Sequence, residues 1–271
     1  MSVRVALLAS LLPVLAEAQG ASTLAGDRAA YAAWLVGSPV SPLAAVAMHR
    51  LQGPVTLGPD TADIPLKQFG PATVAPRGSA AVLTGADGRE RPLPAGRPVA
   101  VAPWTFQVLG EGGAAVLLVY GQARGAPPGW YPPAERLAYT VPLEPPAHPE
   151  RRRVLTLDGI EVEADLAGTV RVPLGPAGTR LQVLRMPVPG TDESELQVYF
   201  RDGTSGKGSY PAGRFVELEP TGGSYRLDFN RARNPFCAYS SVYPCPVPWA
   251  GNTVPVSVEA GERYGAAAAE P

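Results

Sequence analysis

The chain has 271 residues, of which 45% are hydrophobic and 17% charged, and its formal net charge is −1. This composition is rich enough in apolar residues for a packed core and excludes a disordered chain. The near-zero charge, together with the lack of a Lys/Arg-rich run with interleaved aromatics, argues against a nucleic-acid-binding protein. The length allows one large all-β unit or two small domains.

The N-terminus reads MSVRVALLASLLPVLAEAQG and contains the three parts of a signal peptide in order. Arg4 supplies a positive charge, Val5 to Ala16 form an apolar stretch, and Ala16-Glu17-Ala18 offers small residues before a cleavage site. The apolar stretch is too short for a comfortable membrane span. We therefore expect residues 1–18 to be a signal peptide. The mature protein is expected to be periplasmic or extracellular, with no membrane span.

Residues 19–52 are expected to form a short helical segment. Asp27 is expected to cap a helix from Arg28 to Val36, because the stretch GDRAAYAAWLV is rich in alanine. Two prolines then interrupt the pattern. A serine followed by Pro42 favours a second short helix from Leu43 to Arg50.

From Val55 onward, short apolar runs alternate with turn signals, which is typical of antiparallel β proteins. The strongest hairpin signal is Asp158-Gly159 in LTLDGIEVEAD. Further turns are expected at Asp87-Gly88, Gly175-Pro176-Ala177-Gly178 and Thr221-Gly222-Gly223. The sequence therefore predicts a mainly β fold, with antiparallel sandwich or barrel-like sheets and two short N-terminal helices.

A proline-rich stretch, residues 123–149, also holds Trp130, Tyr131 and Tyr139 and apolar residues that favour packing. We interpret it as an ordered crossover between an N-terminal β region, 53–125, and a C-terminal β region, 126–265. Residues 266–271 are expected to be a disordered tail.

The sequence contains neither a phosphate-binding loop nor the nucleophile motif of α/β-hydrolases. Gly206-Lys207 is followed by Gly208 where a phosphate loop needs Ser or Thr, and no G-x-S-x-G run occurs. The stretch DGTSGKGSYPAG is therefore interpreted as a long turn between strands. With only two histidines, His49 and His148, a Ser-His-Asp triad has little support.

The segment LDFNRARNPFCAYSSVYPCPVPWAGN holds all three asparagines and both cysteines. Alternation along its first strand places Asp228 and Asn230 on one face. One interpretation is that Asp and Asn side chains cap the turns and the cysteines staple them. The other is a polar pocket that binds a hard cation such as calcium or the hydroxyls of a small ligand. Because an exported protein is oxidised, Cys237 and Cys245 are predicted to form a disulfide.

Much of the mature chain carries motifs in a recognisable order. They are Trp130-Tyr131-Pro132-Pro133, Asp202-Gly203-Thr204-Ser205-Gly206, Tyr210, Gly213-Arg214, Leu227-Asp228-Phe229-Asn230, Asn234-Pro235, Cys237, Cys245-Pro246, Asn252 and Ala260-Gly261-Glu262. This pattern resembles a bacterial and archaeal family known as domain of unknown function 1684. Three positions depart from it: the family tends to have tyrosine at Arg233, a CPLPP run at Cys245–Trp249, and an acidic residue at Gly251.

The resemblance implies no established activity. Many relatives look cytosolic, where a disulfide would not persist, so it also implies roles for the cysteines as thiols, metal ligands or small packing residues. By analogy, it favours a function for the polar segment.

The leading hypothesis is a binding module for a small molecule, with a divalent metal as the alternative ligand and no other cofactor. Its expected ligand groups are Arg214, as the partner of an anion, with Asp228, Asn230, Asn234, Asn252 and Glu262. A second hypothesis is a hydrolase with Asp228 or Glu262 as acid/base and Cys237 as nucleophile. A third is a structural protein of the cell envelope without a ligand site.

Overall fold

The computed structural model describes residues 23–110, 115–188, 193–247, 249 and 251–265. The expected signal peptide and the expected C-terminal tail lie outside these residues. Within the described ranges, no helix is long and apolar enough to cross a membrane. The prediction of export therefore rests on the sequence.

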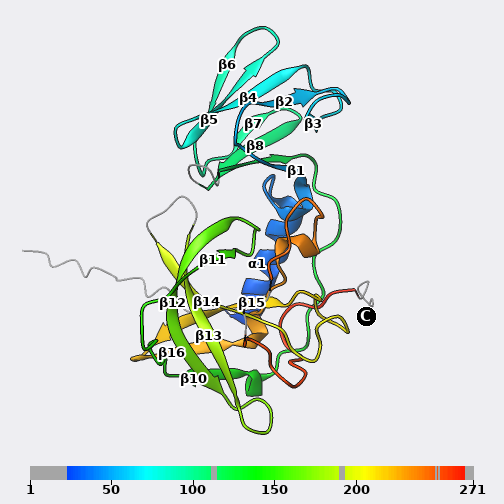
Figure 1. Cartoon of the computed structure of the whole chain (residues 1–271). Coiled ribbons are helices and arrows are strands. Elements are labelled where there is room, and N and C mark those ends of the chain that lie inside the picture. Colours follow the sequence, from blue (N-terminus) through cyan, green and yellow to red (C-terminus); the bar gives the residue numbers. More distant parts are fainter. Residues whose placement is uncertain (1–22, 111–114, 189–192, 248, 250, 266–271) are drawn as a thin grey trace, which may run out of the picture.

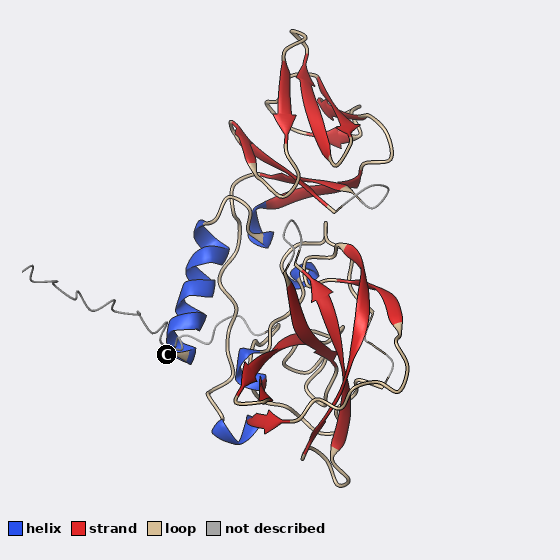
Figure 2. Cartoon of the chain, turned by 90° about the vertical axis from the view of Figure 1, so that its left-hand side faces the viewer, coloured by secondary structure: helices blue, strands red, loops and turns tan. Residues whose placement is uncertain are grey.

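One α-helix, α1 (Leu24–Gly37), opens the described chain and runs beside the C-terminal sheet (Figures 1 and 2). Its N-cap is Thr23, whose side chain accepts a hydrogen bond from the Gly26 amide at 3.1 Å. The predicted cap, Asp27, instead lies in the first turn, where a carboxylate stabilises the positive end of the helix. The first helix is thus confirmed, and it begins earlier than expected.

The second predicted helix, Leu43 to Arg50, is wrong. Residues Pro42–Ala44 form a single 3-10 turn, and the chain continues as strand β1 (Ala45–Arg50), which carries His49. β1 pairs antiparallel with β9 (Val116–Tyr120), a strand whose five residues are all buried. Pairing with this core strand outweighs the helix propensity of an alanine-rich sequence.

The N-terminal lobe consists of two sheets. A four-stranded sheet has the order β1-β9-β8-β7, and a five-stranded sheet has the order β3-β2-β4-β5-β6. The remaining strands are β2 (Val55–Gly58), β3 (Ile64–Pro65), β4 (Ala72–Arg77), β5 (Ala80–Gly85), β6 (Glu90–Leu93), β7 (Val99–Val101) and β8 (Trp104–Leu109). Aliphatic residues and Phe106 fill the space between the two sheets.

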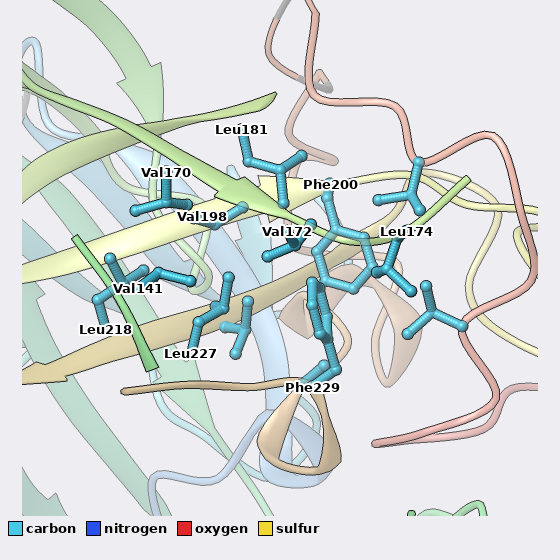
Figure 3. Packing of buried hydrophobic residues seen from close by; sticks show 14 of the residues in the cluster. Val141, Val170, Val172, Leu174, Leu181, Val198, Phe200, Leu218, Leu227 and Phe229 are labelled. Atoms are coloured by element: carbon cyan, nitrogen blue, oxygen red, sulfur yellow. The ribbon is translucent and has the colours of Figure 1, made fainter. Parts of the chain in front are cut away.

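The C-terminal lobe is one antiparallel sheet of seven strands in the order β10-β16-β15-β14-β13-β12-β11. Its strands are β10 (Ala138–Val141), β11 (Arg151–Leu155), β12 (Glu161–Val172), β13 (Thr179–Pro187), β14 (Ser194–Phe200), β15 (Arg214–Thr221) and β16 (Ser224–Asp228). The sheet curls around a core in which the rings of Phe200 and Phe229 meet edge to face, 5.0 Å apart (Figure 3).

The predicted turns fall where strands connect. Asp158-Gly159 separates β11 from β12, Gly175–Gly178 separates β12 from β13, and Gly222-Gly223 separates β15 from β16. The fold is therefore mainly β, as the alternation of apolar runs and turn signals predicted. The expected crossover stretch supplies β10, which pairs with β16 at the edge of the sheet.

Candidate functional site

Asp228 ends strand β16 and begins the segment that sequence reasoning singled out. Its carboxylate accepts hydrogen bonds from the backbone N and the side-chain Nδ2 of Asn230, at 3.0 and 2.8 Å, and so caps a 3-10 turn. A guanidinium nitrogen of Arg226 lies 2.9 Å from its other oxygen. Asp228 and Asn230 therefore lie together, as the strand pattern predicted.

The Asn230 side chain is engaged by the backbone of a distant residue. Its Oδ1 accepts from the Ala134 amide at 2.8 Å, and its Nδ2 donates to the Ala134 carbonyl at 3.0 Å. Arg28 of α1 donates to the Asn230 carbonyl at 3.0 Å. These bonds fasten the turn to the loop before β10 and leave no side-chain group of Asn230 directed at a ligand.

Asn252 lies in a different part of the lobe and is fully buried. Its Oδ1 accepts from the Gln182 amide at 2.8 Å, and its Nδ2 donates to the Gln182 and Tyr199 carbonyls at 2.9 and 3.1 Å. The side chain thus bridges β13 and β14 at the end where their own pairing stops. Its partners differ from those of Asp228 and Asn230, so the structure does not bring Asn252 into the same site.

Arg214, predicted to bind an anion, is 0% exposed. Its guanidinium pairs with Asp202 at 3.3 Å and donates to the carbonyls of Val258, at 2.8 Å, and Ala260. Its central carbon lies 5.3 Å from the ring centre of Phe200. Arg214 therefore ties the C-terminal segment to strand β15. The anion that it binds is the Asp202 carboxylate of the protein itself and not a ligand.

Glu262 and Asn234 form a second buried pair. The carboxylate of Glu262 accepts from the Asn234 amide at 2.6 Å and from the Tyr239 hydroxyl at 2.7 Å, both through Oε2. Its Oε1 is buried and has no hydrogen-bond partner among the described residues. Burial raises the pKa of Glu262 to about 7, although these two hydrogen bonds and two arginines favour the ionised form. At 0% exposure the carboxyl is out of reach of a substrate in this conformation.

The two cysteines are free thiols in the structure, so the predicted disulfide is not formed. Cys237 is half-buried and Cys245 is exposed, with the Tyr210 hydroxyl 3.2 Å from the Cys245 sulfur. Burial, followed by contact with Cys245, raises the pKa of Cys237 to about 12. Because the thiolate is the nucleophile, this environment gives no support to Cys237 as a catalytic group.

The metal alternative also lacks a cluster of ligands. Across the described ranges, no group of three or more His, Cys, Asp or Glu side chains is placed to hold a metal ion. Of the six predicted ligand residues, Asp228 lines the groove described next. The other five hold backbone segments together.

The groove lies on the outer face of the C-terminal sheet, between α1 and the chain that follows β16. Its main cavity has a volume of about 260 Å³, and a second cavity of about 490 Å³ adjoins it. Four residues line both, namely Leu157, Arg231, Arg233 and Phe236. We call the two cavities together the arginine groove.

Two arginines of this groove differ in their partners. Arg231 pairs with Asp27 of α1, and the carboxylates of Glu219 and Asp228 lie 3.9 and 4.0 Å from it. Arg233 has no ion pair with any described residue, and its guanidinium carbon lies 4.2 Å from the ring centre of Tyr31. Its backbone is fixed by two 2.8 Å hydrogen bonds with Phe215. Arg233 is therefore a positioned cation that makes no ion pair with a described residue.

Two carboxylates on neighbouring strands complete the charge pattern. Glu195 on β14 and Glu217 on β15 both line the main cavity, and neither makes an ion pair in the described part of the chain. Although Glu217 is an exposed residue, the protein packed around its carboxyl raises its pKa, Glu195 raises it further, and Arg233 lowers it. Aromatic and apolar side chains of Trp34, Phe236 and Met186 line the groove beside these charges.

Sequence reasoning missed these residues because they come from separate segments, namely α1, the loop after β11, strands β13, β14 and β15, and the chain after β16. Tyr31 and Trp34 are three residues apart on α1, so they share a helix face, but the sequence does not say what that face covers. Arg233 did carry a signal, because it stands where the resembling family tends to have tyrosine.

The protein is a mainly β protein with a curled antiparallel C-terminal sheet, and a charged, aromatic-lined groove lies on that sheet. The chain belongs to the family described as "Protein of unknown function (DUF1684)", whose model matches residues 129–263. Arg214, Asp228, Arg233 and Glu262 all lie within the matched part.

A solved structure gives a second comparison. The chain is similar to an uncharacterised protein of Haloarcula marismortui solved by solution NMR, with 32% sequence identity and a TM-score of 0.42. The match covers 50% of this chain and 75% of that one. No curated protein matches the chain significantly.

Proposed function

We propose that the protein binds a small zwitterionic molecule with an apolar body, of the size and class of a free amino acid, in the arginine groove. The observation that carries this proposal is the presence, in one groove, of an unpaired cation and unpaired carboxylates. Arg233 would bind the ligand carboxylate, and Glu195 with Glu217 would bind its ammonium group.

The charges of the groove favour this ligand over a simple anion. Arg226 and Arg231 already have carboxylate partners, so Arg233 is the guanidinium left for a ligand. Guanidinium–carboxylate hydrogen bonds are strong and directional because both groups are charged. A bound ammonium group would also relieve the repulsion that helps to raise the pKa of Glu217.

The apolar walls account for the rest of the ligand. Small-molecule sites are mostly apolar, with a few polar groups that fix the orientation. Trp34, Phe236 and Met186 provide such walls, and the adjoining cavity leaves room for a side chain. The hydrolase hypothesis receives no comparable support, because Glu262 is enclosed and Asp228 is held by Arg226 and Asn230.

The test is calorimetric titration of the full chain with three matched compounds: phenylalanine, 3-phenylpropionate, which lacks the amine, and 2-phenylethylamine, which lacks the carboxylate. We expect phenylalanine to bind at least about tenfold more tightly than either analogue, because each lost charge contact is worth about 1.4 kcal/mol or more. Arg233→Tyr should abolish the advantage over the amine, and Glu217→Gln should reduce the advantage over the carboxylate.

Arg97→Ala is the matched control, since Arg97 is exposed in the N-terminal lobe. It should leave all three affinities within about twofold. Binding of phenylalanine no tighter than that of its analogues, no binding of any of the three, or full affinity in Arg233→Tyr would each contradict the proposal.

A further inference from the structure

A cavity separate from the arginine groove lies where the C-terminal chain reaches the N-terminal lobe. Its volume is about 490 Å³. It is lined by the start of β1, the residues after β3, the start of β8, the residues after β9 and the turn at Tyr239-Ser240. The Ser240 hydroxyl donates to the Ala45 carbonyl at 3.4 Å, which joins the two walls. We call this cavity the interlobe cleft. It shares no lining residue with the arginine groove.

The interlobe cleft is positively charged. Lys67 and Arg124 both line it, and neither side chain makes an ion pair or hydrogen bond with any residue that the structure describes. No carboxylate is among the residues that line it. Two exposed cations in one cleft without a compensating acid attract an anion, and each can form charge-assisted hydrogen bonds with it.

Trp104 gives the cleft a flat apolar wall. Its indole is half-buried against the N-terminal core and lies against Gly121, where an added Cβ would come within 2.8 Å of the ring. Its indole N–H is buried and lacks a hydrogen-bond partner in the described chain. An aromatic face beside polar groups suits a ring that is apolar on its face and polar at its rim.

Two amide side chains complete the lining. Gln68 and Gln122 are exposed and make no side-chain hydrogen bond within the described ranges, so their donors and acceptors are available. Gln68 has a φ of +63°, which is uncommon for a residue other than glycine. Backbone strain of this kind concentrates at binding and catalytic sites.

We propose that the interlobe cleft binds an anionic saccharide. The sugar ring would lie on Trp104, Lys67 and Arg124 would bind its carboxylate or phosphate, and Gln68 and Gln122 would bind its hydroxyls. This inference is independent of the arginine groove, because the two sites share no residue.

The test follows the Trp104 indole signal by NMR in the full chain, assigned through Trp104→Phe, while four probes are titrated. The probes are digalacturonate, glucose 6-phosphate, the neutral disaccharide galactobiose and inorganic phosphate. We expect one charged saccharide to bind at least about tenfold more tightly than both galactobiose and phosphate, because only it meets the cations and the ring wall together. The two charged probes distinguish a carboxylate ligand from a phosphate ligand.

The double variant Lys67→Ala/Arg124→Ala should weaken this binding at least about tenfold. Arg97→Ala/Arg136→Ala removes the same charge at exposed positions away from the cleft and should change it less than about twofold. Equal binding of galactobiose or phosphate, no binding by either charged saccharide, or an unaffected Lys67/Arg124 variant would overturn the proposal. Thermal unfolding of each variant separates loss of binding from loss of fold.

Discussion

The two faces of strand β15 hold arginines in opposite situations. On the inner face, Arg214 is enclosed and bonded to Asp202 and to carbonyl groups of the C-terminal segment. On the outer face, the backbone of Arg233 is fixed beside Phe215, and its guanidinium lies over a tyrosine ring but makes no ion pair with a described residue. The arginine side chain therefore serves the fold where an ion pair and carbonyl groups engage it, and it becomes a candidate for ligand binding where it makes no ion pair.

This difference applies to the whole set of polar residues in the C-terminal lobe. Asn230 and Asn252 resemble Arg214, because backbone groups occupy their amides. Glu262 is intermediate, with one oxygen bonded and one without a partner among the described residues. We expect substitutions to reduce stability most at residues whose side chains are engaged by protein groups, and to affect ligand binding most at residues whose charge makes no ion pair.

Arg214→Met should give the largest effect, a loss of about 3–5 kcal/mol in the free energy of unfolding, measured by urea denaturation. The change leaves the Asp202 carboxylate buried without its cation and removes the donor to the Val258 carbonyl. Arg226→Met is the matched control, because Arg226 also pairs with an aspartate but is half-exposed, and it should cost less than about 1 kcal/mol. Equal losses in the two variants would contradict a structural role specific to Arg214.

Glu262 should make stability fall as the pH rises. The folded-state pKa of about 7 lies above the ordinary value of 4.5, so the folded protein holds this proton more tightly than the unfolded chain. The stabilisation is therefore fully present below about pH 4.5 and is lost as the pH rises through about 7. Relative to Glu262→Gln, the wild type should lose about 3 kcal/mol between pH 4.5 and 8, measured by urea denaturation at each pH.

Glu90→Gln controls for the loss of an ordinary carboxylate, since Glu90 is exposed. Its stability should follow that of the wild type across the pH range. If Glu262→Gln also ran parallel to the wild type, Glu262 would not titrate abnormally, and the incomplete bonding of its carboxyl would have no energetic consequence.

The sequence predicted the sheets better than it predicted the site. Hairpin signals such as Asp158-Gly159 are local, so they located the turns of the C-terminal lobe. Strand β1 was mistaken for a helix because its sequence, AVAMHR, does not alternate between apolar and polar residues. Its pairing with β9 also joins residues that are far apart in the chain. A local sequence pattern thus identifies a turn or hairpin, but it does not identify a strand that depends on pairing with a distant partner.

The polar segment illustrates the same limit. The sequence singled out Asp228, Asn230 and Asn252, and all three are buried and hydrogen-bonded. Their roles depended on partners that it could not show, because the Asn230 and Asn252 side chains bond to residues 96 and 70 positions away. The groove likewise depends on α1, strands β13 to β15 and the chain after β16 meeting in space. The clustering of Asp and Asn therefore predicted that these side chains form hydrogen bonds. It did not predict whether their partners belong to the protein or to a ligand.

The smallest expected effect is that of Gln68→Gly, which should make the protein more stable but weaken ligand binding. Gln68→Gly should raise the free energy of unfolding by about 0.5–1 kcal/mol, because glycine adopts a φ of +63° without strain. Gln52→Gly, at an exposed residue with an ordinary φ, should instead lower it by a similar amount, because glycine adds freedom to the unfolded chain. Urea denaturation measures both changes in stability.

If the interlobe cleft binds an anionic saccharide, Gln68→Gly should also weaken that binding about two- to fivefold, since one hydrogen bond is lost. A gain in stability with unchanged binding would show that the strained backbone at Gln68 serves no ligand, whereas a loss in both would show that the side chain belongs to the fold.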